Sequence, residues 1–439
     1  MASAGIVSLI ILAVAFALGL SVAVTMGLGG LLIAEIFIPR SVWGMLGELP
    51  WNIGTSVSLV ALPLFILMGE FLMRSGVTDR MYDTLAKWLN PLPGGLLHTN
   101  VVACALFACV SGSSAATAAT ISSVSLPALR TYGYNVRLSL GSLAAGGTLG
   151  ILIPPSITFI VYAVLVEESI GQLYIAAIVP GILMTLSFMV VIFVAAIRRP
   201  KDAPRVGAST WREKVVSLGA LLPVFGLMLV VLGTMFAGIA TATEAAGFGA
   251  ALAFLLAAVN GRLNSKMLAE AFVVTATTTA MIMFILFGAF VLQFVLGFLG
   301  IPTAVSNWIA GLGLSKVQVV MLICLVYLVL GTFMEELSMI ITTIPVLLPM
   351  LKSLQIDLVW FGVIVVILVQ AAMISPPVGV NLFILQGLRT RLAGPREKTP
   401  ISDVFMGVMP FFLAMLVTLA LIVTFPQIAM WLVGMSQAK

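Results

Sequence analysis

The stretch GILIPPSITFI, residues 150–160, decides how the rest of the chain is understood. Pro154 and Pro155 stand together within a segment that is otherwise apolar enough to cross a bilayer. A proline inside a helix removes a backbone donor and clashes with the preceding turn, at a cost of about 3 kcal/mol. In hydrocarbon, every backbone group that such a break frees must find another partner. The stretch therefore predicts a membrane helix that is interrupted at mid-course.

The composition indicates a protein that is embedded in a lipid bilayer. The chain has 439 residues, of which 61% are hydrophobic and only 8% are charged. Soluble domains carry about 25% charged residues, so we expect an all-α polytopic membrane protein. The net charge of +5 comes from short loops, which indicates orientation in a membrane and not binding to nucleic acid. Cys104, Cys109 and Cys324 all fall in apolar segments, where small buried hydrophobes are expected.

Apolar runs that are long enough to span a bilayer number about ten. They lie near residues 5–20, 22–38, 52–73, 138–165, 170–197, 215–237, 241–259, 272–299, 357–386 and 404–434.

Two further runs, about 97–129 and 317–351, have a different pattern. Each is apolar at both ends, ends near a proline, and is interrupted in the middle by small or polar residues. The interruptions read ACVSGSSAATAATISS and GTFMEELSMIITT. A re-entrant helical hairpin, which enters and leaves the membrane on one side, accounts for this pattern better than a plain span.

The distribution of basic residues supports both hairpins. If both are re-entrant and the N-terminus faces outside, 17 of the 21 Lys and Arg residues lie on the cytoplasmic side. The other side keeps only Arg40, Lys316, Lys352 and Lys439. This asymmetry follows the positive-inside rule and predicts that both termini are periplasmic. The first hairpin then opens from the cytoplasm and the second from the outside.

An internal repeat accompanies the hairpins. At an offset of 222 residues, Pro127, Pro154 and Pro155 coincide with Pro349, Pro376 and Pro377. Five crossings separate the two copies in this topology, so the second copy is inverted. The predicted organisation is N-terminal scaffold helices (1–50), a first repeat (51–197), a cytoplasmic linker with connecting scaffold helices (198–270) and a second repeat (271–439).

Inverted repeats with broken helices are typical of secondary transporters, whose sites lie near the bilayer midplane. A helix broken at a Pro-Pro pair exposes carbonyls, which can coordinate a cation, and amides, which suit an anion. Packing alone is the competing explanation of a proline kink. Hydroxyl oxygens near both breaks are hard ligands for a small cation. They belong to Ser111, Ser113, Ser114, Thr117 and Thr148 in the first half, and to Thr332 and Ser375 in the second.

Acidic residues inside membrane segments are expensive and commonly functional. Glu244 either caps the helix that starts near Thr241–Thr243 or has an ionic role, and the sequence leaves both open. Glu335 and Glu336 lie at the second hairpin tip. Glu70 stands four residues before Arg74, which is the spacing of a local ion pair.

Six motifs together resemble a known family. They are PLFILMGEFLMRSG, SGSSAATAATISSVSLPAL, GGTLGILIPPSI, EESIGQLYIAAIVPG, TEAAGFGA and SPPVGVNLFI. Nearly the whole chain resembles the large, DctM-like membrane subunit of the tripartite ATP-independent periplasmic (TRAP) transporters. The resemblance implies an elevator-type ion transporter fold in the bacterial inner membrane, coupled to Na⁺ and without a covalent cofactor. It also implies a small four-helix membrane subunit and a periplasmic substrate-binding protein that delivers an organic acid.

The resemblance also implies site residues. One sodium site would involve Ser111, Ser113, Gly147, Gly150 and Pro154. The other would involve Gly331, Thr332, Ala372, Ser375 and Pro376. The substrate would lie between the hairpin tips, near Ser114, Thr117, Thr158 and Asn381. The chain departs from the family pattern at Glu335–Glu336, where Asp-Pro is frequent.

Several functions are excluded by what the sequence lacks. No GxxxxGK[ST] motif is present for ATP hydrolysis, and one histidine cannot form the HExxH site of a zinc protease. The expected function is import of a carboxylate such as a dicarboxylate, a sialic or other sugar acid, or a keto acid. The alternatives are a receptor-independent symporter or antiporter, a membrane-embedded enzyme that uses Glu244, Glu335 or Glu336, and a channel.

Overall fold

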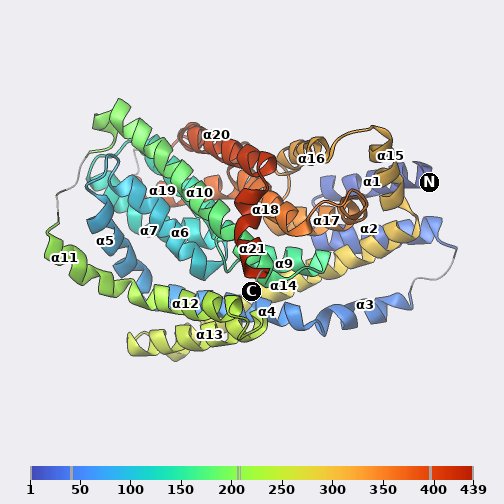
Figure 1. Cartoon of the computed structure of the whole chain (residues 1–439), viewed down its shortest axis with the longest axis horizontal. Helices are drawn as coiled ribbons and strands as arrows, with labels where there is room; N and C mark the ends of the chain where they lie inside the picture. Colours follow the sequence, from blue (N-terminus) through green and yellow to red (C-terminus); the bar gives the residue numbers. More distant parts are fainter. Residues whose placement is uncertain (1, 40–42, 205–206, 208, 395–397, 438–439) are drawn as a thin grey trace.

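A computed structural model describes residues 2–39, 43–204, 207, 209–394 and 398–437. Within these ranges the chain is helical and contains no strand, which confirms the predicted all-α class (Figure 1). Four residues of the charge count, Arg40, Arg205, Arg396 and Lys439, lie outside the described residues.

The first part of the chain contains ten helices among the described residues and ends with the 29-residue α10. Its helices are α1 (Ala2–Ala17), α2 (Val22–Phe37), α3 (Met45–Gly54), α4 (Val57–Arg74), α5 (Val77–Leu89), α6 (Leu96–Ser111), α7 (Ser114–Thr131), α8 (Val136–Leu152), α9 (Ile157–Val166) and α10 (Ile170–Arg198). A connecting region follows, with η1 (Pro200–Asp202), α11 (Trp211–Ser217), η2 (Leu218–Ala220), α12 (Leu222–Phe236) and α13 (Ala242–Val259).

The second part of the chain starts with the 34-residue helix α14. Its helices are α14 (Ser265–Phe298), α15 (Ile301–Gly311), α16 (Lys316–Leu330), α17 (Glu336–Ser353), α18 (Leu358–Ile374), α19 (Val380–Leu392), α20 (Ser402–Thr424) and α21 (Gln427–Gln437).

Length and apolarity agree with a multi-pass membrane protein. Among the described residues, six helices are long and apolar enough to cross a membrane, or up to eight if each bent helix pair counts as one span. The other apolar helices are shorter and include α6, α16 and α18, which belong to the predicted hairpins and breaks. Several apolar runs that are continuous by hydropathy are therefore divided into shorter helices in the structure.

The first predicted hairpin appears as the helix pair α6 and α7. The turn between them is short because Gly112 adopts a left-handed conformation, with φ at +57°, that glycine accepts without strain. Ser113 then caps α7, its hydroxyl accepting from the Ala116 amide. The pair covers 96–131, close to the expected 97–129.

The predicted interruption at Pro154 and Pro155 is confirmed. Helix α8 ends at Leu152, α9 begins at Ile157, and the two axes differ by 42°. The Ser156 hydroxyl donates to the Ile151 carbonyl at 2.6 Å, so a carbonyl freed by the break has a partner. The same hydroxyl accepts from the Phe159 amide and caps α9. Residues of the break itself therefore satisfy its freed backbone groups, which is needed in a bilayer core because no water is available there.

The second half repeats this pattern. Helices α16 and α17 cover 316–353, against an expected 317–351, and are joined by a hydrogen bond between the Tyr327 and Thr343 hydroxyls. Helix α18 ends at Ile374 and α19 begins only at Val380, so the chain is also interrupted at its second Pro-Pro pair. All of α18 is buried, and α8, α10, α16, α17 and α20 pack around it.

Helix lengths in the two halves correspond. Helices α7 and α17 each have 18 residues, and α8 and α18 each have 17. Ser114 and Glu336, the first residues of α7 and α17, are 222 positions apart, as are Val136 and Leu358, the first residues of α8 and α18. This offset is the one found for the prolines in the sequence.

Several boundaries differ from expectation, and the runs 52–73 and 215–237 are interrupted as well, between α3 and α4 and before α12. The run 404–434 was read as one span, but α20 ends at Thr424 and α21 starts at Gln427. The reason is Pro426, because a proline disfavours helical conformation in the residue before it, and Phe425 indeed lies at φ −122° and ψ 78°. Helix α15 was not expected and follows the positive-φ Gly300.

Candidate functional site

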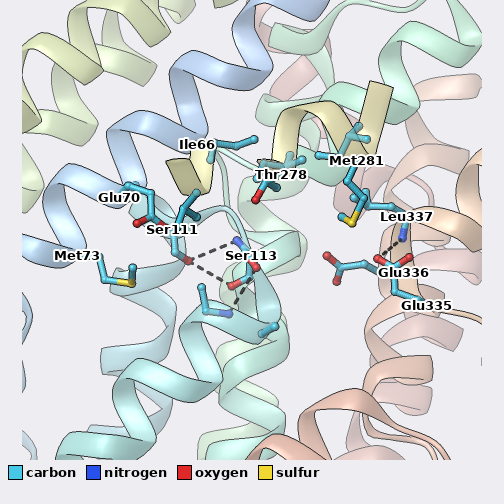
Figure 2. A pocket seen from close by; sticks show the side chains of 16 residues that line it. Ile66, Glu70, Met73, Ser111, Ser113, Thr278, Met281, Glu335, Glu336 and Leu337 are labelled. Atoms are coloured by element: carbon cyan, nitrogen blue, oxygen red, sulfur yellow. Dashed lines mark hydrogen bonds between the residues drawn. The ribbon is translucent and has the colours of Figure 1, made fainter. Parts of the chain in front are cut away.

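A cavity of about 360 Å³ lies where the two hairpin tips face each other (Figure 2). Ser111 and Ser113 of the first tip line it on one side, and Glu335 and Glu336 of the second tip line it on the other. Helices α4 and α14 close it, through residues such as Glu70 and Thr278. In Figure 1 the two hairpins lie on opposite sides of α18; α4 packs against α6 of the first hairpin and α14 against α17 of the second.

The first tip concentrates oxygen atoms. The Ser111 and Thr117 hydroxyls are 2.7 Å apart, and the Thr117 hydroxyl donates to the Ser113 carbonyl at 2.8 Å. Gly150 of α8 packs directly against them, since a Cβ there would lie 2.4 Å from the Ser113 carbonyl oxygen. The tip and the end of α8 are thus in close contact, and only glycine allows it.

The second tip carries two carboxylates with different surroundings. Glu335 caps α17, its oxygens accepting from the amides of Leu337 and Ser338 and from the Ser338 hydroxyl at 2.7 Å. Glu336 is different, because its Oε2 is buried and has no hydrogen-bond partner among the described residues. A buried carboxylate without a partner is costly unless a cation or a proton compensates it.

Of the first predicted sodium set, the structure brings Ser111, Ser113 and Gly150 together at the tip. Gly147 lies one turn away, where an added Cβ would be 2.6 Å from the Cβ of Ala118 on α7. Pro154 lies in the break itself, next to Pro155, whose carbonyl oxygen faces Gly112. The set therefore occupies one continuous region between the first hairpin and the break in α8–α9.

The second predicted sodium set is more dispersed. Gly331 at the end of α16 packs against Ala372 of α18, where an added Cβ would be only 2.3 Å from the Ala372 Cβ. The Ser375 hydroxyl donates to the Pro376 carbonyl at 3.4 Å within the break. The Thr332 hydroxyl, in the turn that follows α16, donates to the Val329 carbonyl at the end of α16 at 2.7 Å.

The four predicted substrate residues, Ser114, Thr117, Thr158 and Asn381, are fully buried and do not line the cavity. Asn381 Nδ2 donates to the Ser114 hydroxyl at 2.8 Å, which joins α19 to α7. The Thr158 hydroxyl and the Asn381 Oδ1 have no hydrogen-bond partner among the described residues. The cavity wall is formed by their neighbours, Ser113 and Ile157 among them.

A second contact joins the two interrupted elements. Gln370 of α18 donates from Nε2 to the Thr148 carbonyl of α8 at 2.8 Å, and both residues are fully buried. The two positions are separated by 222 residues, the offset of the sequence repeat. Sequence reasoning noted Thr148 but did not identify Gln370, although a glutamine in an otherwise apolar span was a visible signal.

Several cavity residues were assigned other roles or missed. Glu70 forms the expected ion pair with Arg74, at 3.0 Å, yet it also lines the cavity. Thr278 and Met281 of α14 were not identified, although the threonine-rich stretch 275–279 is unusual in a span. Glu244 is exposed and forms a capping box with Thr241, which supports the capping interpretation.

Comparison with known proteins gives a consistent result. The family model described as "Tripartite ATP-independent periplasmic transporter, DctM component" matches residues 9–428. The chain is 34% identical to the C4-dicarboxylate TRAP transporter large permease protein DctM of Pseudomonas aeruginosa, over 94% of this chain and 95% of that protein. It is 30% identical to the 2,3-diketo-L-gulonate TRAP transporter large permease protein YiaN of Escherichia coli K12, over 86% and 87% respectively.

Among solved structures, the fold is similar to that of the YdaH transporter of Alcanivorax borkumensis. The TM-score is 0.62 at 18% sequence identity, and the alignment covers 87% of each chain. At this identity the likeness concerns the fold alone.

Proposed function

Because this chain belongs to the DctM family of TRAP transporter large permeases, we propose that it moves an organic acid across the bacterial inner membrane, driven by sodium. The acid is a carboxylate, since the related permeases from Pseudomonas aeruginosa and Escherichia coli carry C4-dicarboxylate and 2,3-diketo-L-gulonate in their names. The chain is a multi-pass membrane protein, in which transport and not chemical conversion of the solute is the activity.

The observation that carries this proposal is the meeting of both hairpin tips at one cavity between α4 and α14. The hairpin tips of both halves converge there with the start of α9, which follows the first break, and secondary transporters build their sites from such elements. The equal lengths of α7 and α17, and of α8 and α18, support an inverted repeat. We infer that one part of the chain slides as an elevator against the scaffold helices.

Sodium suits the oxygen atoms at the first tip. The Ser111 and Thr117 hydroxyls and the Ser113 carbonyl lie within hydrogen-bond distance of one another, and hard oxygens are the ligands that alkali and alkaline-earth cations prefer. Ser111, Ser113, Gly147, Gly150 and Pro154 would form one site, and Gly331, Thr332, Ala372, Ser375 and Pro376 the other. Each Na⁺ that crosses ~100 mV gains about 2.3 kcal/mol, enough to drive an accumulation.

The complete transporter would contain two further proteins. A small four-helix membrane subunit would stabilise the scaffold, and a periplasmic substrate-binding protein would deliver the acid. The 17 of 21 basic residues assigned to one side orient this chain with both termini in the periplasm. The tips then alternate between the two sides of the membrane.

The test is uptake in proteoliposomes that contain this chain and its small membrane subunit. A radiolabelled C4-dicarboxylate, a sugar acid and a keto acid are offered in turn, each with its periplasmic receptor in the external buffer. We expect accumulation of unchanged solute only when a sodium gradient points inward, and none when potassium replaces sodium. Equal uptake without a sodium gradient would contradict the coupling.

Omission of the receptor separates the proposal from a receptor-independent symporter. We expect uptake to fall to background without the receptor and to return when it is added. Undiminished uptake in its absence would show that this chain captures the acid itself. Chemically altered solute inside the vesicles would indicate an enzyme and would overturn the assignment.

A further inference from the structure

A groove of about 780 Å³ lies apart from the hairpin cavity, with no lining residue in common. It is formed where the N-terminal ends of α8 and α20 meet the C-terminal end of α10. The three helices pack against one another. The groove has a polar end and an apolar wall, and each limits the kind of ligand that could bind there.

Three arginines line the polar end: Arg137 at the start of α8, Arg198 at the end of α10, and Arg199 directly after it. Asp403 of α20 also lies there and accepts from Arg137 at 2.9 Å. Its second oxygen accepts from Arg389 at 2.9 Å, so this carboxylate is already shared between two guanidinium groups.

Arg198 and Arg199 are left available. Both side chains are exposed, and neither forms an ion pair or a side-chain hydrogen bond with the residues that the structure describes. The one other carboxylate in the lining is that of Asp202. Counting Arg389, the groove has more guanidinium than carboxylate groups, so its polar end favours an anion.

The wall of the groove is apolar and faces outward. Val190 and Val194 of α10 are 60% and 40% exposed, and Met406 of α20 is 48% exposed. Helices α10 and α20 are both long and apolar enough to cross a membrane, so these side chains lie on a surface that acyl chains cover. Soluble phosphate has no part that would use such a wall.

We propose that this groove binds an anionic phospholipid, with its phosphate between Arg198, Arg199 and Arg137 and an acyl chain along Val190 and Val194. All three arginines belong to the side that the charge distribution assigns to the cytoplasm, where basic pockets between membrane helices bind anionic headgroups. The bound lipid joins α8, the helix that leads into the first break, to α10 and α20. This inference depends only on the location in a membrane and not on the solute or the coupling ion.

The test compares lipid binding by the purified chain and by the Arg198→Gln/Arg199→Gln variant. Native mass spectrometry in detergent counts bound phosphatidylglycerol against phosphatidylcholine, over a range of lipid concentrations. Both arginines are exposed, so the variant is expected to fold. We expect about a 30-fold weaker affinity for phosphatidylglycerol, equal to about 2 kcal/mol for two arginines near the headgroup.

A matched control removes the same charge elsewhere. Arg212→Gln/Arg391→Gln also replaces two exposed arginines of the same predicted side, but neither lines the groove. We expect this control to bind phosphatidylglycerol as the parent chain does. Equal loss in both double variants would mean that only net charge matters and would overturn the assignment.

Two further arms separate the lipid from soluble phosphate. Glycerol 3-phosphate in excess should not displace phosphatidylglycerol, and Val194→Gln should weaken lipid binding while the arginines remain. Displacement by glycerol 3-phosphate at the lipid's own concentration would show a simple anion site. Equal affinity of the parent chain for phosphatidylglycerol and phosphatidylcholine would refute the proposal outright.

Discussion

Gly150→Ala tests the contact between the break in α8–α9 and the first hairpin tip. An alanine Cβ would lie 2.4 Å from the Ser113 carbonyl oxygen and 2.7 Å from the Thr117 hydroxyl oxygen. Since ordinary contacts of this kind begin near ~3.4 Å, the tip and α8 must separate by about 1 Å. Such overpacking costs about 1–3 kcal/mol in a closely packed site.

The same displacement separates the oxygens that we assign to sodium. Thr117 bonds to both Ser113 and Ser111, so movement of its hydroxyl disturbs the whole cluster. We expect the sodium concentration for half-maximal uptake to rise about tenfold, which corresponds to ~1.4 kcal/mol. The assay is sodium-dependent uptake in proteoliposomes, with the amount of reconstituted protein measured in each preparation.

Two other glycines provide graded controls. Gly226 of α12 has no neighbouring atom within 4 Å of an added Cβ, so Gly226→Ala should leave sodium dependence unchanged. At Gly146 the added Cβ would lie 3.1 Å from Cys104 Sγ, a milder contact on the α6 side of α8. We expect Gly146→Ala to lower thermal stability with little effect on sodium dependence. Wild-type sodium dependence in well-expressed Gly150→Ala would refute the reasoning.

Further substitutions test the second tip, the ion ligands and the buried polar contacts. Glu336→Gln removes a carboxylate with a buried, unpaired oxygen and should raise the free energy of unfolding by about 1–3 kcal/mol. Glu335→Gln weakens the cap of α17 and should lower the free energy of unfolding. Thermal unfolding in detergent measures both variants, and stabilisation by both would contradict the two different roles. Ser113→Ala and Thr332→Ala should each lower sodium affinity more than expression, and unchanged sodium dependence in both would remove the ion-site assignment. Asn381→Leu leaves the buried Ser114 hydroxyl on α7 without its donor and should destabilise the protein by about 1–3 kcal/mol. The unfolding temperature measures this effect, and an unchanged temperature would show that the contact contributes nothing to stability.

The broken helices and hairpins were readable from the sequence because their signals are local. Pro154 stops a helix by removing its own N–H and by clashing with the preceding turn, whatever lies nearby. The interruptions 108–123 and 331–343 are likewise local, and the observed hairpins end within about two residues of the expected bounds. Proline also explains why the run 404–434 is divided, because Pro426 disfavours helical conformation at Phe425.

The lining of the cavity could not be read from the sequence in the same way. The angular position of a residue on its helix decides which neighbours it contacts. In a membrane helix that is apolar all round, no hydrophobic stripe in the sequence marks the face that points inward. Glu70 carried a local signal for an ion pair, and nothing local indicated that it would also face Glu336 across a cavity. Nothing local indicated either that Asn381, a predicted substrate residue, is fully buried and donates to the Ser114 hydroxyl.

The amino-acid sequence by itself determined that the chain resides in a membrane, and it determined the helix breaks, the two hairpins and the spacing of the repeat. Hydropathy and proline geometry act within a few residues, so they need no knowledge of distant partners. Only the tertiary structure decided which polar groups come together, since Gln370 donates to the Thr148 carbonyl, and Ser113 and Glu336 line one cavity, through the packing of helices more than 200 residues apart. That packing is governed by the shapes of many side chains at once, which no single stretch of sequence specifies.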